Sequence, residues 1–432
     1  MPAAKCILEL HVAGAWHAAA EVRVDDDALG LGSPARVEYD FDYLDAMGSA
    51  LGTRDLRAVS CRYPIGYQVD AETAWPAFLL DLVPSGAARR FWEAQLGLPN
   101  VARSDWAVLT AGEGNTPGNL RVAEAALAIP ADPPAHPGFA REDVLERADR
   151  FIEYAREQGA SIAGGSGAAG DAPKFLLRED RQGRWHADGA LPDRRTARAW
   201  LVKFPRSPRA ADRLVLEAEA PYYGLAKRLG ARTAGPLTWE RDCLFVPRFD
   251  RVVTKERHVE RLGLESLCSL AGISEFGAPV AKERLVAAVA RFTTDPKREL
   301  RELVLRDVLD VALGNTDNHA RNTALLKHLD GRIELSPLYD FAPMVLDPHG
   351  IARVSRWTTE TGGYPDWTGV AEALSDAIGE AEVKAMKRWL RGLAARVRDL
   401  PAHMRTDGVP NAVVEPLEAR IARVAAALAE VR

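Results

Sequence analysis

The segment 299–342 constrains the fold more than any other part of this sequence. Apolar residues recur there at helical spacing, and Gly314 stands where a helix commonly ends in a left-handed turn, so we predict a helix that stops at this glycine. A polar loop, 315–322, follows. Two strand-like runs then flank Asp330 and Gly331, a pair that favours a two-residue type I′ hairpin in which residue 329 pairs with residue 332.

This hairpin returns Asp340 to the polar loop that holds Asp317 and Asn322. Three oxygen-bearing side chains then converge, and hard oxygen ligands suit Mg²⁺. The order matches the protein-kinase scheme, in which an aspartate orients or deprotonates the acceptor hydroxyl, an asparagine five residues later binds one metal ion, and an aspartate before phenylalanine binds the other. We therefore predict Asp317 as a catalytic residue and Asn322 and Asp340 as metal ligands.

Each of these residue types also has a structural explanation. Aspartate and asparagine often follow helices because their side chains cap turns, so any one of them alone carries little weight. The five-residue spacing, the hairpin and the Asp-Phe pair at 340–341 together favour the functional interpretation. His319 joins Asp317 as a candidate catalytic residue, although a histidine in such a loop is more often an orienting or packing residue.

A nucleotide site also needs groups that contact phosphates, and the glycine-rich run 164–170 is the candidate. Gly164, Gly165, Ser166 and Gly167 allow backbone N–H groups to approach an anion, because glycine tolerates the required dihedral angles. Glycine-rich loops are often only flexible, and this one is not a Walker A sequence because no Gly-Lys-Ser or Gly-Lys-Thr follows.

Lys203 lies in an apolar, strand-like run at 200–204. A lysine in such a run is costly unless it is paired or binds an anion, so we predict a contact with ATP phosphates. Glu217 or Glu219, near the start of the next predicted helix, is the expected partner. The structural alternative is a lysine on an edge strand that reaches solvent.

Composition is that of an ordinary globular protein: 47% of the 432 residues are hydrophobic and 27% are charged. The net charge of -5 argues against a surface built wholly for nucleic acid. The four cysteines are widely scattered, with no CxxC pair and no histidine at metal-ligand spacing, so the sequence indicates neither a disulfide framework nor a zinc site and fits a reducing cytoplasm. No run of eighteen apolar residues occurs, so we expect no membrane span.

The proline-rich stretch 129–137 is the clearest linker in the sequence. We predict an α+β protein in three parts: a small N-terminal α+β subdomain over 1–128, a mixed-sheet nucleotide-binding part over 138–256 and a mainly helical lobe over 257–432. The second part is expected to begin with one helix over 141–158.

The sequence resembles the HipA-like serine/threonine kinases of bacterial toxin–antitoxin systems. The specific motifs are GNTDNHARN at 314–322 and LSPLYDF at 335–341. Further similarity lies in LVKFP at 201–205, RFDR at 248–251 and LAKRLG at 225–230, with weaker similarity in FLLDLVPSG at 78–86 and around Gly118. The resemblance therefore extends over essentially the whole chain.

The resemblance implies a two-lobed kinase fold and phosphorylation of a protein hydroxyl with ATP and Mg²⁺. By position it assigns Lys203 to the phosphates of ATP, backbone groups near Val246 to Phe249 to the adenine hinge, and Asp250 to the ribose. Glu219, an expected partner of Lys203, completes the predicted nucleotide site. It also implies a small helix-turn-helix antitoxin as partner, DNA contact only through that antitoxin, and a protein substrate such as an aminoacyl-tRNA synthetase.

The glycine loop departs from the pattern of the family. Relatives usually carry an autophosphorylated serine seven residues before the lysine that corresponds to Lys174, and Gly167 stands there in this sequence. Ser166 is therefore the candidate for autophosphorylation. Two alternative functions stay open: a small-molecule kinase of the aminoglycoside or choline type, and a catalytically weak nucleotide-binding co-repressor in an antitoxin–DNA complex.

Overall fold

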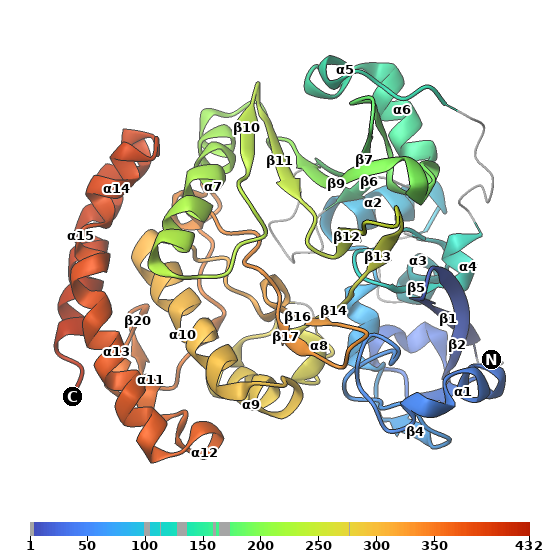
Figure 1. The fold of residues 1–432 in the computed structure, drawn as a ribbon, viewed down its shortest axis with the longest axis horizontal. Coiled ribbons are helices and arrows are strands. Elements are labelled where there is room, and N and C mark those ends of the chain that lie inside the picture. The colour runs from blue at the N-terminus through green and yellow to red at the C-terminus, as the bar shows by residue number, and fades with distance from the viewer. Residues whose placement is uncertain are drawn as a thin grey trace. The chain divides into compact units, whose positions relative to one another are not determined.

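The computed structural model describes residues 4–98, 104–112, 114–127, 136–158, 161–163, 173–275 and 277–432 (Figure 1). The chain folds into two compact units. The first comprises Met1–Phe204, Phe245–Phe276 and Leu325–Ile333, and the second comprises Pro205–Leu244, Gly277–Ala324 and Glu334–Arg432. The predicted division into 1–128, 138–256 and 257–432 stays a prediction.

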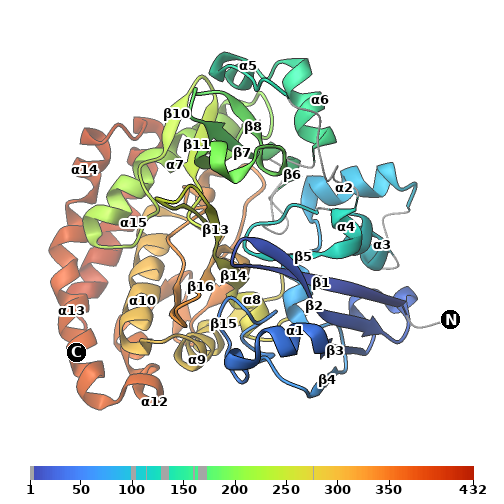
Figure 2. The ribbon, with the colours of Figure 1, turned by 45° about the vertical axis from the view of Figure 1, so that its right-hand side comes forward.

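The first sheet of the first unit is antiparallel, with strand order β4-β3-β2-β1-β5. Buried and exposed residues alternate along β3, so one face packs against the core and the other faces solvent. Figure 2 shows β1 to β4 side by side. The elements are β1 (Ala4–Val12), β2 (Ala15–Val24), β3 (Ala35–Tyr39), α1 (Phe41–Ala46), β4 (Val69–Glu72), α2 (Gly86–Gln95), α3 (Asp105–Ala111), β5 (Leu120–Val122) and α4 (Ala123–Ala126).

The second sheet of the first unit places β11, β9, β7 and β6 next to one another in that order, and β8 pairs with β7. A small sheet of order β14-β16-β17 and the pair β12-β13 accompany it. The elements are α5 (Arg141–Leu145), α6 (Asp149–Glu157), β6 (Ser161–Ala163), β7 (Pro173–Asp180), β8 (Trp185–Ala187), β9 (Thr196–Lys203), β11 (Cys243–Pro247), β12 (Arg251–Val253), β13 (Val259–Arg261), β14 (Gly263–Ser266), α8 (Leu267–Leu270), β16 (Ala324–Lys327) and β17 (Ile333–Leu335).

The single helix expected over 141–158 is wrong. Arg147 adopts a positive φ of 52°, which ends α5 and lets α6 begin two residues later. The Ala148 N–H donates to the Asp143 carbonyl (3.0 Å) across this break. The helical pattern of apolar residues continues through both pieces, so the sequence alone does not reveal the interruption.

The second unit is mainly helical, and α10 is its central element. Fourteen residues of α10 are buried, and α15 packs against both α10 and α13. Gly314 ends α10 at φ 72°, as predicted, and a Cβ there would lie 2.6 Å from Val345 Cγ1. The elements are α7 (Ala210–Leu229), β10 (Thr238–Glu240), β15 (Val280–Ala281), α9 (Lys282–Phe292), α10 (Pro296–Leu313), β18 (Ser355–Arg356), β19 (Glu360–Thr361), β20 (Tyr364–Pro365), α11 (Trp367–Glu372), α12 (Ser375–Ile378), α13 (Glu380–Arg398), α14 (Leu400–Thr406) and α15 (Asn411–Ala429).

The four cysteines are free and buried. Among the residues that the structure describes, no helix is both long and apolar enough to cross a membrane.

Candidate active site

The loop that follows α10 is polar yet buried, and it is fastened to the helix at its first residue. The Asn315 side chain donates to Asp310 Oδ1 (2.8 Å), and its backbone N–H donates to the Asp310 carbonyl (2.9 Å). Asn318, His319 and Asn322 farther along the loop are each less than one-tenth exposed. A buried polar loop of this kind requires internal hydrogen bonds, and these fix its shape.

Asp317 and Asn322 lie together. Asn322 Nδ2 donates to the Asp317 carbonyl (2.8 Å), across the 3₁₀ turn Ala320–Asn322 that the Asn322 N–H closes onto the His319 carbonyl (2.9 Å). His319 Nε2 lies 3.4 Å from Asp317 Oδ1. The imidazole therefore neighbours the carboxylate predicted to be catalytic, which fits an orienting role.

Asp340 is brought to the same loop through its neighbour. The Tyr339 hydroxyl donates to the Arg321 carbonyl (2.6 Å), so the residue before Asp340 contacts the residue before Asn322. Asp340 itself has φ 49°, a left-handed conformation that few non-glycine residues adopt and that gathers at functional sites. The next residue, Phe341, is fully buried against Tyr222 of α7, with ring centroids 5.5 Å apart.

The hairpin that returns Asp340 differs from the predicted one by one residue. The His328 N–H donates to the Arg332 carbonyl (2.9 Å), and the Ser336 N–H donates to the Ala324 carbonyl (2.8 Å). Of Asp330 and Gly331, only Gly331 has a positive φ (86°), so the turn is a three-residue loop rather than type I′. The shift leaves Asp340 beside the loop because a one-residue slip moves a strand by only about 3.4 Å.

Glu219 lies on α7 and is 3% exposed. Tyr223, one helical turn later, is also buried. Burial raises the pKa of its hydroxyl well above the ordinary value, and the carboxylates of Glu219 and Asp340 add to this shift. Tyr223 therefore lies near two predicted site residues. We did not predict it, although its spacing of four from Glu219 placed both on one face of a helix.

Lys203 is buried at the end of β9, which lies between β7 and β11. The edge-strand alternative is therefore wrong. Its partner across the antiparallel pair is Lys174 of β7, also buried. Directly opposed side chains lie on the same face of a sheet, so the side chains of Lys203 and Lys174 project from one face there. Lys174 is a second cation that the sequence analysis did not assign to the site.

The predicted hinge lies at the end of β11. Val246 is buried and Phe249 is half-buried, and the Arg248 N–H between them donates to the Ala199 carbonyl (3.0 Å). The predicted glycine loop, with Gly164, Gly165, Ser166 and Gly167, lies outside the described residues.

Asp250 is embedded in buried charges. Its carboxylate accepts from Arg248 Nε (2.9 Å), Arg248 Nη2 (2.6 Å), Arg251 Nη1 (2.8 Å) and the Gly118 N–H (2.8 Å). Burial alone would raise the pKa of this carboxyl, but the two guanidinium groups and the Gly118 N–H hold it well below its ordinary range. These donors give Asp250 a structural role, and the predicted contact with a ribose stays a prediction.

The donor set around Asp317 fits Mg²⁺. Asn322 commits its nitrogen to the Asp317 carbonyl, so its oxygen is the end that can face a cation. Among the described residues, no group of three or more His, Cys, Asp and Glu side chains is placed to hold a metal ion. Proteins usually supply only one or two oxygen ligands to Mg²⁺, and water and substrate phosphates occupy the other coordination positions.

Comparison with solved structures identifies the fold. HipA of Shewanella oneidensis MR-1, solved as a toxin–antitoxin complex with HipB and operator DNA, aligns with a TM-score of 0.67 at 17% identity, over 97% of this chain and 96% of that chain. The Helicobacter pylori proinflammatory kinase CtkA aligns with a TM-score of 0.36 at 14% identity, over 62% of this chain and 94% of its own. The mixture of helices and sheets, together with the alignment to HipA, confirms the predicted α+β fold class.

The sequence profile of the HipA-like C-terminal domain matches residues 166–400. The chain therefore belongs to the HipA-like family. A search of curated protein sequences finds no significant match.

Proposed function

We propose that this protein is a kinase that uses ATP and Mg²⁺ to phosphorylate a serine or threonine hydroxyl of another protein. The observation that carries the proposal is the hydrogen bond between Asn322 and Asp317 in a buried loop, with Asp340 in a left-handed conformation next to that loop. Membership of the HipA-like family supports it.

In phosphoryl transfer the protein contributes mainly by positioning the reacting groups and by stabilising charge. Asp317 orients the acceptor hydroxyl and takes its proton, and His319 holds the Asp317 carboxylate in place. Asn322 and Asp340 hold Mg²⁺, which when bound neutralises negative charge on the phosphates. Lys203 and Lys174 bind phosphate oxygens of ATP, and backbone groups near Val246 and Phe249 receive the adenine.

We further propose that the protein acts as a cytoplasmic toxin with a small helix-turn-helix antitoxin as its partner and with DNA reached only through that partner. The Shewanella protein of similar fold was solved with HipB and operator DNA, which supports this assignment. An aminoacyl-tRNA synthetase is the protein substrate that the family resemblance suggests.

The proposal is tested by transfer of radiolabel from γ-labelled ATP to a library of serine and threonine peptides, with the purified full-length protein and Mg²⁺. Asp317→Asn and Asp340→Ala should each lower the rate at least about 100-fold, the usual scale for loss of an acid–base or charge-stabilising group. Asp376→Asn, an exposed aspartate on α12, is the matched control and should leave the rate unchanged. Wild-type rates in both site variants would refute the assignment.

The two alternative functions give different results in the same assay. Transfer to an aminoglycoside or to choline, without transfer to peptides, would identify a small-molecule kinase. Tight binding of ATP with Mg²⁺ in calorimetry, without turnover on any acceptor, would identify a nucleotide-binding co-repressor.

A further inference from the structure

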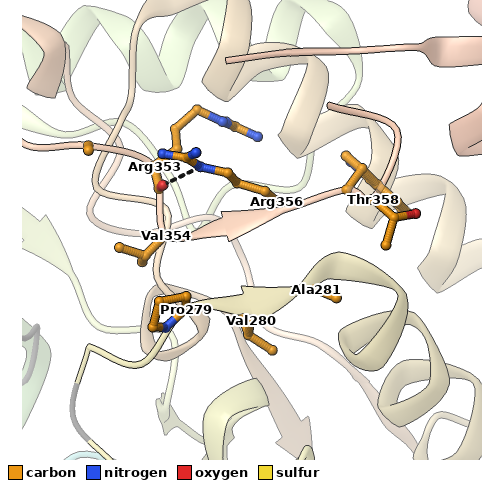
Figure 3. A pocket seen from close by; sticks show the side chains of 9 residues that line it. Pro279, Val280, Ala281, Arg353, Val354, Arg356 and Thr358 are labelled. Carbon is orange, nitrogen blue, oxygen red and sulfur yellow. Dashed lines mark hydrogen bonds between the residues drawn. The ribbon is translucent and has the colours of Figure 1, made fainter. Parts of the chain in front are cut away.

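A pocket of about 480 Å³ lies beside the loop that carries Asp317, along the short parallel strands β15 and β18 (Figure 3). Pro279, Val280 and Ala281 form one wall, and the segment from Ala352 to Thr358 forms the other. All these residues belong to the second unit. The role proposed above for Asp317 and its neighbours makes no use of this pocket.

The lining is apolar except for two arginines and a threonine. Arg353 is buried and already neutralised, since it pairs with Asp307 (3.0 Å) and Glu360 (3.2 Å). Arg356 is exposed, and its Nε donates to the Arg353 carbonyl (2.7 Å). Within the described part of the chain, no carboxylate pairs with Arg356. The pocket therefore combines an apolar floor with an uncompensated cation at its rim.

One side chain connects this pocket to the proposed active site through hydrogen bonds. Asn318, the residue after Asp317, accepts at Oδ1 from the Val354 N–H (3.1 Å) and donates from Nδ2 to the Ser355 carbonyl (2.7 Å). The Val280 N–H donates to the Val354 carbonyl (3.1 Å), which joins the opposite wall to the same segment. Both walls are thus fixed relative to the loop.

The hydrogen bonds of Asn318 set an upper limit on the distance between the pocket wall and the proposed catalytic residue. One Cα step, one short side chain and one hydrogen bond add up to about 10 Å from Asp317 to the Val354–Ser355 backbone. An extended peptide rises about 3.3 Å per residue. An extended substrate segment of about two to four residues spans that separation.

We propose that the pocket selects the protein substrate, by binding an extended segment next to the phosphorylated hydroxyl. The segment places an apolar side chain against the apolar surface that the two neighbouring strands form, and an aspartate or glutamate against Arg356. Charge complementarity favours this occupant, because an acidic side chain supplies the partner that Arg356 lacks, and the apolar floor disfavours a purely polar ligand. The inference rests on the proposed kinase function and adds a preference that this function does not require.

A positional peptide library with one fixed serine tests the proposal, with the full-length protein and radiolabelled ATP. The wild type should favour Asp or Glu at one position two to four residues from the serine and an apolar residue next to it. Arg356→Glu should abolish or reverse the acidic preference and raise KM for the best acidic peptide at least tenfold, with kcat and the KM for ATP little changed. Arg388→Glu, the same charge change on an exposed face of α13, is the matched control.

A second variant examines the pocket without altering charge. Ala281 lines it and is exposed, so Ala281→Trp should fill the space without disturbing the core and should raise the peptide KM at least tenfold. Transfer to peptides without positional preference, or an acidic preference that survives Arg356→Glu, would overturn this inference and leave the kinase assignment standing. Absence of transfer to any peptide would overturn both.

Discussion

The side-chain nitrogen of Asn322 donates to the backbone carbonyl of Asp317 over 2.8 Å. This single bond spans the five residues between the proposed metal ligand and the proposed catalytic residue, and it orients the Asn322 amide so that its oxygen faces away from the loop backbone. The spacing of the two residues in the sequence is thus compatible with this loop-closing bond.

Replacement of Asn322 by alanine should remove both the loop-closing donor and the oxygen offered to Mg²⁺. We expect the Mg²⁺ concentration for half-maximal phosphoryl transfer to rise at least about tenfold, the usual scale for loss of a ligand or its support. Titration of the rate with Mg²⁺ at saturating ATP measures this. Asn411→Ala, an exposed asparagine at the start of α15, should behave as the wild type. An unchanged titration in Asn322→Ala would exclude Asn322 as a ligand.

Tyr339→Phe removes the hydroxyl that donates to the Arg321 carbonyl and leaves the ring in place. The free energy of unfolding should fall by about 1 kcal/mol, the net value of one such bond. The rate of transfer should fall as well, because Asp340 loses the contact that joins its segment to the loop. Urea denaturation and the radiolabel assay measure the two effects. Lower stability with a wild-type rate would show that this bond does not position Asp340.

Asp310 should make the free energy of unfolding depend on pH. Burial, with the nearby Asp307 carboxylate, raises the pKa of Asp310 from 3.8 to about 6, against the opposing charges of Lys282 and Arg353. Between about pH 4 and pH 6 the folded chain binds more protons than the unfolded chain. The free energy of unfolding should therefore fall as the pH rises through this range and stay at the lower value above it.

Asp310→Asn should remove this loss of stability at higher pH, because the asparagine carries no charge. It should keep an oxygen that accepts the hydrogen bond from Asn315. The variant should exceed the wild type in free energy of unfolding by on the order of 2 kcal/mol at pH 8, and the gain should shrink towards pH 4. Denaturation curves at several pH values measure it. The lowered pKa of Asp307, about 2, acts below this window and does not interfere. A gain independent of pH would contradict the prediction.

Asp250→Ala separates a structural role from a ribose contact. Removal of the carboxylate leaves Arg248 and Arg251 buried without it, which typically costs 3 to 5 kcal/mol, so we expect a loss of about 3 kcal/mol or more. Calorimetry with ATP and with 2′-deoxy-ATP at low temperature tests the site itself. A stable variant that no longer distinguishes the two nucleotides would restore the ribose assignment.

Local features of the site were predictable from sequence, and features set by distant contacts were not. Gly314 as a helix end and the return of Asp340 toward the loop follow from spacing and turn preference. The register of the hairpin does not, because it depends on whether Asp330 adopts a positive φ. Lys174 was missed because its position opposite Lys203 comes from strand pairing across thirty residues of sequence.

Residues that lie far apart in sequence also decided the units of the fold. The first unit's use of Phe245–Phe276 leaves no trace in the pattern of apolar residues. The proline-rich stretch at 129–137 stays a predicted boundary that rests on composition alone.

The buried charges around Asp250 have a consequence for any shortened form of this chain. Gly118 supplies an N–H to Asp250 and a carbonyl to Arg251, and the Thr116 carbonyl also accepts from Arg251. A fragment that begins after the proline-rich stretch would strip these backbone partners from ionised groups that cannot reach water. Such a fragment should be insoluble. Removal of the N-terminal part of the chain is therefore a poor route to a minimal enzyme.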